Sequence, residues 1–203
     1  MDKSLKLISI LLDYPTEKIQ KSFESFKSFL IDDESLSHKS RQKIERFIRT
    51  YESISLIEWQ QAYTHLFDYT PSASLYMFDH IYGDSRQRGM AMVNLKMMYD
   101  DEGLELNNRE LPDYLPVYLD FLGSVKDRIS ARDYLAEVAD VLNDLASNLK
   151  KAESPYTELI EVLIKEYANK GKASGYKEMA PLNAIQMTCS GCDLHQSNVN
   201  IEN

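Results

Sequence analysis

The stretch SARDYLAEVADVLNDLASNLKK, residues 130–151, carries the longest helical pattern in the chain and decides its fold class. Its apolar residues recur at intervals of three or four positions, which places them on one face of an α-helix. These residues are Leu135, Val138, Leu142, Leu145 and Leu149. We therefore expect a single helix over the whole stretch.

The same periodicity extends over most of the chain on both sides of this helix. Further helices are expected at about residues 5–12, 19–30, 44–51, 55–67, 86–101, 112–122 and 155–170. Ser55 and Glu58 fit a capping box, which marks the start of the fourth helix. The type of the apolar and aromatic run 75–82 stays open, and no segment combines strand alternation with hairpin turns. The pattern predicts an all-α fold.

The periodicity ends near Gly171, and this divides the chain into two parts. Residues 1–171 are expected to form a single helical bundle domain, which suits a chain of 203 residues. Residues 172–203 are polar and lack helical spacing, so we expect a flexible C-terminal tail.

Composition excludes several classes of function and partner. The formal net charge of −9 argues against nucleic acid, because binding to phosphates depends on positive charge. No apolar run approaches the roughly 20 residues that span a bilayer, so no stable membrane association is expected. The short apolar run near the N-terminus has no cleavage site typical of a signal peptide, and the chain holds only two cysteines. Both features favour a cytoplasmic protein.

Motifs of catalysis are missing from the sequence. All seven glycines lie at or beyond Gly83, and none forms a phosphate loop or a dinucleotide fingerprint. No histidine belongs to an HExxH or Glu-x-x-His pattern, and no GxSxG is present. We therefore expect a protein that is not an enzyme and has no cofactor of its own.

The predicted tail holds Cys189, Cys192 and His195, which are weak candidates for metal ligands. A Cys-x-x-Cys pair can chelate a soft metal or cycle between dithiol and disulfide. A closed zinc site needs four ligands, and this segment offers three. Two interpretations stay open, namely a metal or redox carrier that acts through the tail, and an exposed tail with reduced thiols.

Two segments in the middle of the chain are dense in polar residues with apolar flanks, FDHIYGDSRQRG at 78–89 and NRELPDYLP at 108–116. Arg86 and Arg88 fall at the start of a predicted helix, where the partial positive charge of the helix dipole disfavours cations. Asp79, Asp84 and Asp113 are their candidate partners. Either these residues form a structural ion-pair network that joins two helix starts, or they belong to a binding site.

These two segments resemble the NarJ family, the assembly chaperones of membrane-bound respiratory nitrate reductase. The family pattern has Phe, an acid and His before a Gly-acid-Ser-Arg-x-Arg-Gly run, and then Glu-Leu-Pro-Asp-His-Leu-Pro after a helix. The first segment matches closely. In the second, Tyr114 stands where the family has His. The resemblance is strongest over residues 60–123 and does not reach the tail.

The resemblance implies an all-helical fold shared with the TorD/DmsD type of redox enzyme maturation chaperones. It also implies a partner, the catalytic (alpha) subunit of nitrate reductase. Such a chaperone binds this subunit before molybdenum cofactor insertion, through an N-terminal segment that resembles a twin-arginine leader, and keeps it competent for the insertion. The same kind of chaperone with a different molybdoenzyme client is the alternative.

Candidate residues for binding the client peptide come from both segments and their flanks. They are Tyr76, Phe78, Asp79, His80, Tyr82, Asp84, Arg86, Arg88, Glu110, Asp113, Leu115 and Tyr118. The aromatic and aliphatic members are expected to line an apolar groove for an amphipathic helix or turn, and the alternative for each is a place in the core. The acidic members are expected at the rim, where they would steer a basic leader.

Overall fold

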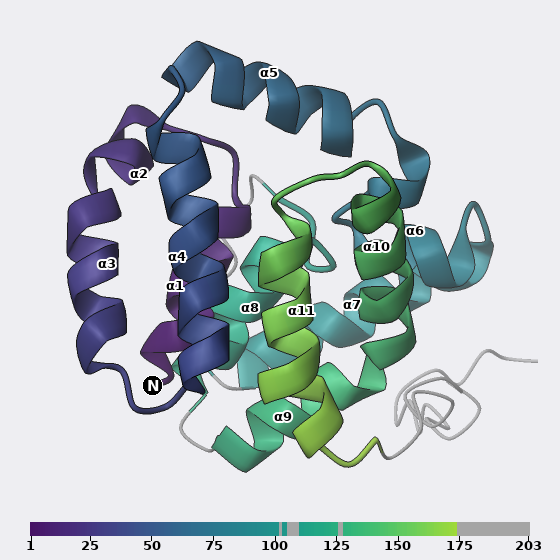
Figure 1. Cartoon of the computed structure of the whole chain (residues 1–203). Helices are drawn as coiled ribbons and strands as arrows, with labels where there is room; N and C mark the ends of the chain where they lie inside the picture. The colour runs from purple at the N-terminus through teal and green to yellow at the C-terminus, as the bar shows by residue number, and fades with distance from the viewer. Residues whose placement is uncertain (102, 105–109, 126–127, 174–203) are drawn as a thin grey trace, which may run out of the picture.

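The computed structural model describes residues 1–101, 103–104, 110–125 and 128–173. Within these ranges the chain forms α-helices and short 3-10 helices without a β-strand, which confirms the predicted all-α fold (Figure 1). The α-helices are α1 (Lys3–Leu12), α2 (Glu17–Lys21), α3 (Phe23–Asp32), α4 (His38–Glu52), α5 (Leu56–Phe67), α6 (Met77–Tyr82), α7 (Arg86–Asp101), α8 (Leu115–Ser124), α9 (Arg128–Glu137), α10 (Ala139–Lys151) and α11 (Thr157–Glu166). The 3-10 helices are η1 (Pro71–Ala73) and η2 (Ala168–Lys170).

Helix α1 connects the N-terminal helices to α8. It packs closely along α8, from the opposite part of the sequence. The Ser9 hydroxyl donates to the Pro116 carbonyl at 2.7 Å, and Lys6 Nζ lies 2.6 Å from Asp120 Oδ1. On the other side of the bundle, α11 packs between α4 and α10, while α5 crosses one end (Figure 1). The bundle is therefore built largely from contacts between distant segments.

A cluster of aromatic rings fills the core where α4, α5 and α11 meet. Trp59 is fully buried and stacks on Tyr51 with ring centroids 5.0 Å apart. Its indole N–H donates to the Tyr156 hydroxyl at 2.8 Å, so the one polar atom of the indole is satisfied. Phe47 and Phe67 each lie 4.9 Å from the Tyr156 ring. This cluster fixes α5, which leads directly into the first of the two motif segments.

Two stretches that were each expected to form one continuous helix form two helices instead. The helix expected over residues 19–30 is interrupted at Ser22, whose hydroxyl donates to the Lys18 carbonyl and offers the backbone an alternative to helical bonding. The helix expected over residues 130–151 is interrupted at Val138, where φ is −104° and ψ is 16°. The Val138 side chain nevertheless stays in the core, so the apolar period continues through the break. The capping box of Ser55 and Glu58 is confirmed.

The chain at the expected end of the helical domain lies against α9. Gly171 passes so close to α9 that an added Cβ atom would lie 2.1 Å from the Arg132 carbonyl oxygen. The Lys172 N–H donates to Asp133 Oδ1 at 2.7 Å. The contact with the bundle thus includes Lys172, while the division at residues 171 and 172 stays a prediction because residues 174–203 lie outside the described ranges. Among the described helices, none combines the length and the apolar character needed to cross a membrane.

Candidate functional site

The two motif segments meet through their backbones. The Met77 N–H donates to the Asp113 carbonyl at 3.0 Å, and the Leu115 N–H donates to the Leu75 carbonyl at 2.8 Å. Tyr76 and Tyr114 form an isolated antiparallel bridge between these bonds, with ring centroids 5.1 Å apart. The start of α6 and the start of α8 are therefore held side by side, whereas the expected pair of helix starts was the one at Arg86 and the one at Pro112.

Asp113 caps a helix, but not the one expected from the sequence. Helix α8 begins at Leu115, so the expected opening of this helix at Pro112 and Asp113 is wrong. The Asp113 side chain is fully buried and its Oδ2 accepts a hydrogen bond from the Phe78 N–H at 3.1 Å. Phe78 lies in the first turn of α6, and the side chain of the N-cap residue Tyr76 does not cap the N–H groups of this helix. Asp113 thus satisfies an N–H group that would otherwise lack a partner.

Arg88 joins Asp79 and Asp113 in one network. Its guanidinium lies 2.6 Å from Asp79 Oδ1 and 3.9 Å from Asp113 Oδ2. The other Asp79 oxygen accepts a hydrogen bond from Ser74 Oγ at 2.8 Å. The carboxylates compensate the cation for its place in the first turn of α7. This arrangement is the structural network that the sequence suggested, with Ser74 as an additional member.

Two atoms of this network, Arg88 Nε and Asp113 Oδ1, are buried and have no hydrogen-bond partner among the described residues. Burial raises the pKa of the Asp113 carboxyl above its ordinary value, although the Phe78 N–H and Arg88 act in the opposite direction. Most buried polar groups in proteins are paired, so the network is held together at some cost in stability.

The remaining charged candidates lie outside the network. Arg86 and Asp84 are both exposed, and neither has an ion pair among the residues that the structure describes. His80 is half-buried, and its Nε2 lies 2.8 Å from the Ser74 carbonyl oxygen, which ties it to the same loop as Asp79. Sequence reasoning missed Ser74, because a serine in a run of turn residues carries no signal of which acid it contacts.

The apolar candidates divide into core and surface residues. Phe78, Leu115 and Tyr118 have exposed fractions of 0%, 1% and 2%, so the expectation that they line an open groove is corrected by their burial in the core. Tyr76 and Tyr82 are half-buried and keep part of their rings at the surface. Close to Tyr76, the Tyr114 ring is buried and its hydroxyl lies 2.7 Å from that of Tyr63. Tyr114 therefore links the site to the core.

The outer surface of the site is acidic. The Tyr76 hydroxyl donates to Glu110 Oε2 at 3.1 Å, and Glu110 is exposed. Partial burial raises the pKa of Tyr76 to about 12, and the negative charges of Glu110, Asp113 and Asp68 contribute to this increase. A tyrosine whose ionisation is opposed by three carboxylates reports a negative local potential. We define the acidic patch as Tyr76, Asp79 and Glu110.

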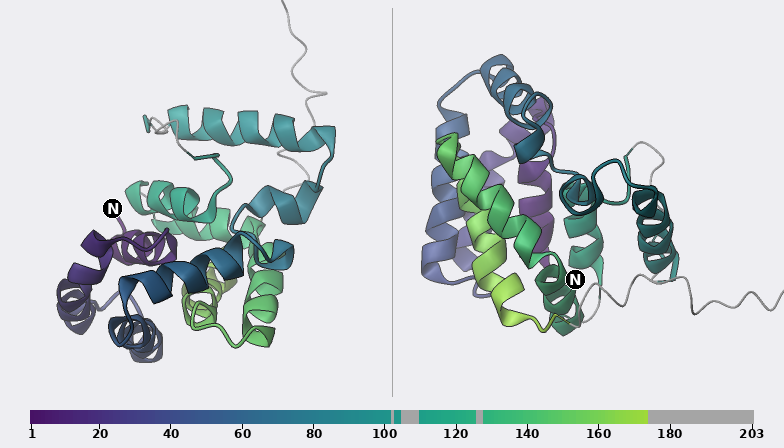
Figure 2. Two further views of the ribbon diagram at one scale, coloured as in Figure 1. Left: turned by 90° about the horizontal axis from the view of Figure 1, so that it is seen from above. Right: turned by 90° about the vertical axis from the view of Figure 1, so that its right-hand side faces the viewer.

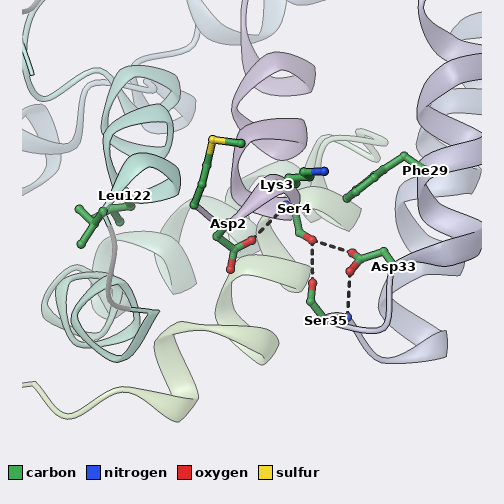
Figure 3. Close-up of a pocket in the computed structure, with 9 residues that line it drawn as sticks. Asp2, Lys3, Ser4, Phe29, Asp33, Ser35 and Leu122 are labelled. Carbon is green, nitrogen blue, oxygen red and sulfur yellow. Dashed lines mark hydrogen bonds between the residues drawn. The ribbon is translucent and has the colours of Figure 1, made fainter.

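A separate cavity of about 320 Å³ lies at the start of α1, away from the two motif segments (Figure 3). The Ser4 hydroxyl in its wall donates to Asp33 Oδ2 at 2.6 Å and lies 2.8 Å from Ser35 Oγ. Asp2 accepts from the Ser4 N–H and so caps α1. The polar groups of this cavity thus serve the junction of α1 with the loop after α3. None of the candidate residues lines it.

The weak metal candidates Cys189, Cys192 and His195 lie outside the described residues. In the described part of the chain, no three His, Cys, Asp or Glu side chains gather in a way that could hold a metal ion. The geometry of the site is that of a rigid, partly acidic junction between two helix starts.

Comparisons with known proteins agree on one family. The family model described as "Nitrate reductase delta subunit" matches residues 33–161, which include both motif segments. The chain is 34% identical over 161 residues to the "Nitrate reductase molybdenum cofactor assembly chaperone NarJ" of Escherichia coli K12, and the match covers 79% of this chain and 68% of that protein. It is 30% identical over 164 residues to the "Probable nitrate reductase molybdenum cofactor assembly chaperone NarJ" of Bacillus subtilis, with 81% and 88% covered.

A solved structure shares the fold. It is the crystal structure described as "a putative redox enzyme maturation protein" from Archaeoglobus fulgidus, which superimposes with a TM-score of 0.58. The match covers 79% of this chain and 90% of that chain at 20% identity. At this level of identity the likeness concerns the arrangement of the helices.

Proposed function

Because the chain belongs to the nitrate reductase delta subunit family, we propose that it acts as a nitrate reductase molybdenum cofactor assembly chaperone. In this role it binds the catalytic subunit of nitrate reductase before the cofactor is inserted and keeps that subunit competent for insertion. The observation that carries the proposal is the match to relatives named for this activity, which covers most of the helical domain. The role is non-catalytic and belongs in the cytoplasm, where a cofactor is inserted before the enzyme docks at the membrane.

The acidic patch is the proposed contact for the client's N-terminal segment. A segment that resembles a twin-arginine leader carries basic residues next to apolar ones. The exposed carboxylate of Glu110 provides charge complementarity for the basic residues, and the exposed part of the Tyr76 ring provides a surface for a guanidinium or an apolar side chain.

The network beneath the patch holds it in place. Asp79 is fixed from both sides, by Arg88 and by Ser74, and Tyr76 is fixed by its bridge to Tyr114. A patch whose side chains are already positioned loses little conformational entropy when a peptide binds. Asp113 and Arg88 are therefore proposed as positioning residues, while Tyr76 and Glu110 are proposed to contact the client.

Calorimetric titration with a synthetic peptide of the client's N-terminal segment tests this site. Glu110→Lys reverses one exposed charge of the patch and should weaken binding about tenfold, which corresponds to about 1.4 kcal/mol. Asp144→Lys makes a matched change at an exposed position of α10 and should leave the affinity unchanged. Equal affinities for wild type and Glu110→Lys would remove the acidic patch from the proposal, whereas the family assignment would be unaffected.

A further inference from the structure

Helix α7 has apolar residues on two opposite faces, and only one of them is covered. Leu95 and Tyr99 are buried, and the Tyr99 ring packs on Phe121 of α8 with centroids 4.3 Å apart. Met90, Val93 and Met97 lie on the other face with exposed fractions of 47%, 53% and 51%. At 100° per residue, these three fall within an arc of about 60°. Both views of Figure 2 place α7 at the outer edge of the molecule.

The ends of the same face carry opposite charges. Arg86 is the first residue of α7, and Asp100 and Asp101 are the last two. All three are exposed, and none has an ion pair within the described ranges. Both ends oppose the helix dipole, which favours acids at the N-terminus and bases at the C-terminus. Along about 22 Å, this face therefore has a basic residue at its start, apolar residues at its centre and acidic residues at its end.

We propose that this face of α7 pairs with the same face of α7 in a second copy of the chain. The two helices run antiparallel about a two-fold axis beside Val93. In this arrangement Met90 faces the second copy's Met97, because both lie equally far from the axis. Arg86 faces the second copy's Asp100 and Asp101 at each end. An interface of this kind is isologous, so one surface supplies both partners.

The order of charges favours a second copy over other occupants. An antiparallel copy matches every charged end of the face with the opposite charge and also offsets the unfavourable interactions with both helix dipoles. A basic leader peptide would place like charges against Arg86. Gly89 lies on the same side of α7, and the position of its absent Cβ has no atom within 4 Å, so a second helix can approach closely there.

The pairing should be weak and sensitive to salt. A stable interface buries about 1,200 Å² of accessible surface or more, and one pair of four-turn helices buries less than this. Dimers should therefore form only at high protein concentration. Ion pairs at the rim of an interface are screened by salt, so concentrations of salt well above about 0.15 M should weaken the pairing.

Sedimentation equilibrium of the full chain without a client tests the pairing through charge reversal. Arg86→Glu makes both ends of the face acidic, and the double change Asp100→Arg, Asp101→Arg makes both ends basic. Each variant alone should dimerise at least tenfold more weakly than wild type. An equimolar mixture of the two should restore association, because the heterodimer pairs acidic ends with basic ends. Lys151→Glu, at an exposed position of α10, is the matched control and should dimerise like wild type.

The charge variants separate loss of contact from loss of folding. Each of them improves the match of α7 to its own dipole, so neither should lower the thermal midpoint. A wild-type chain that stays monomeric at about 1 mM and an ionic strength of about 0.1 M would overturn the proposal. So would a mixture that associates no better than the separate variants. Because no client is present, these outcomes are independent of the proposed chaperone function.

Discussion

At the scale of single residues, Arg88 adds an ion-pair network to the backbone contacts that join the two motif segments. Its guanidinium is only 26% exposed and balances the fully buried Asp113 carboxylate, while Arg86 two residues earlier is exposed. Arg88→Gln should therefore lower the free energy of unfolding by about 1–3 kcal/mol, because it leaves a buried charge without its counter-ion. Arg86→Gln should change it by less than about 0.5 kcal/mol. Urea denaturation of both variants measures the difference.

A second substitution tests the cause of this loss. Asp113→Asn in the Arg88→Gln background removes the buried charge and keeps an oxygen that can accept from the Phe78 N–H. The double variant should be more stable than Arg88→Gln alone. If it is no more stable, the role assigned to the Asp113 charge is wrong.

The residue types and their order in the sequence indicated which residues form this network, but not all of the contacts between them. Asp79 and Asp113 were expected as partners of Arg88 because acids near a misplaced cation are the simplest compensation. The contribution of Asp113 to α6 was not foreseen, since a cap from a distant segment leaves no spacing in the sequence. The burial of Phe78, Leu115 and Tyr118 could not be predicted either. Apolar residues recur at the same spacing on a helix face whether that face lies in the core or lines a groove.

At the scale of helices, Glu166 ties the end of α11 to the start of α4. Its side chain is 2% exposed and accepts hydrogen bonds from Ser37, Ser40 and Lys170. Burial alone would raise the pKa of Glu166, but these hydrogen bonds lower it from 4.5 to about 2. A lowered pKa in the folded state stabilises the protein above pH 4.5, and this contribution is lost as the pH falls towards 2.

Glu166 should change how the free energy of unfolding depends on pH. Between pH 5 and 2 the wild type should lose about 3 kcal/mol more of its unfolding free energy than Glu166→Gln. Denaturant titrations at closely spaced pH values supply both curves. Parallel curves would show that Glu166 titrates normally in the folded chain and that the junction of α4 and α11 does not depend on its charge.

Two glycines give opposite predictions at the level of helix packing. A methyl group at Gly171 would meet the Arg132 carbonyl oxygen of α9, so Gly171→Ala should destabilise the protein by about 1–3 kcal/mol. A methyl group at Gly89, inside α7, would meet nothing, so Gly89→Ala should stabilise it by about 0.5–1 kcal/mol. Thermal melts of the two variants give the signs. A neutral Gly171→Ala would mean that η2 does not dock on α9 as described.

Helix positions followed from periodicity, while helix continuity did not. The breaks at Ser22 and Val138 keep the apolar side chains in the core, so the hydrophobic period passes through both without a change. Tertiary packing accounts for the break at Val138, since α9 packs on η2 while α10 packs on α11. The capping box at Ser55 was readable in advance because its contacts are local.

At the scale of the whole molecule, the bundle places the two motif segments at one junction. The contacts of α1 with α8 and of α11 with α4 bring together segments that are far apart in the sequence. The all-α class was predictable from periodicity. The pairs of helices that pack together were not, because the apolar face of a helix does not specify which other helix covers it. The family followed from the resemblance of the two motif segments, and the family match confirmed it.

The most direct test of the account is capture of the client in its two states. Purified chain is immobilised and offered the catalytic subunit of nitrate reductase, prepared from cells that lack the molybdenum cofactor and from cells that make it. We expect the chain to retain the cofactor-free subunit and to retain at least tenfold less of the loaded subunit. Equal retention of both forms, or retention of neither, would contradict the proposal that this chain is an assembly chaperone for nitrate reductase.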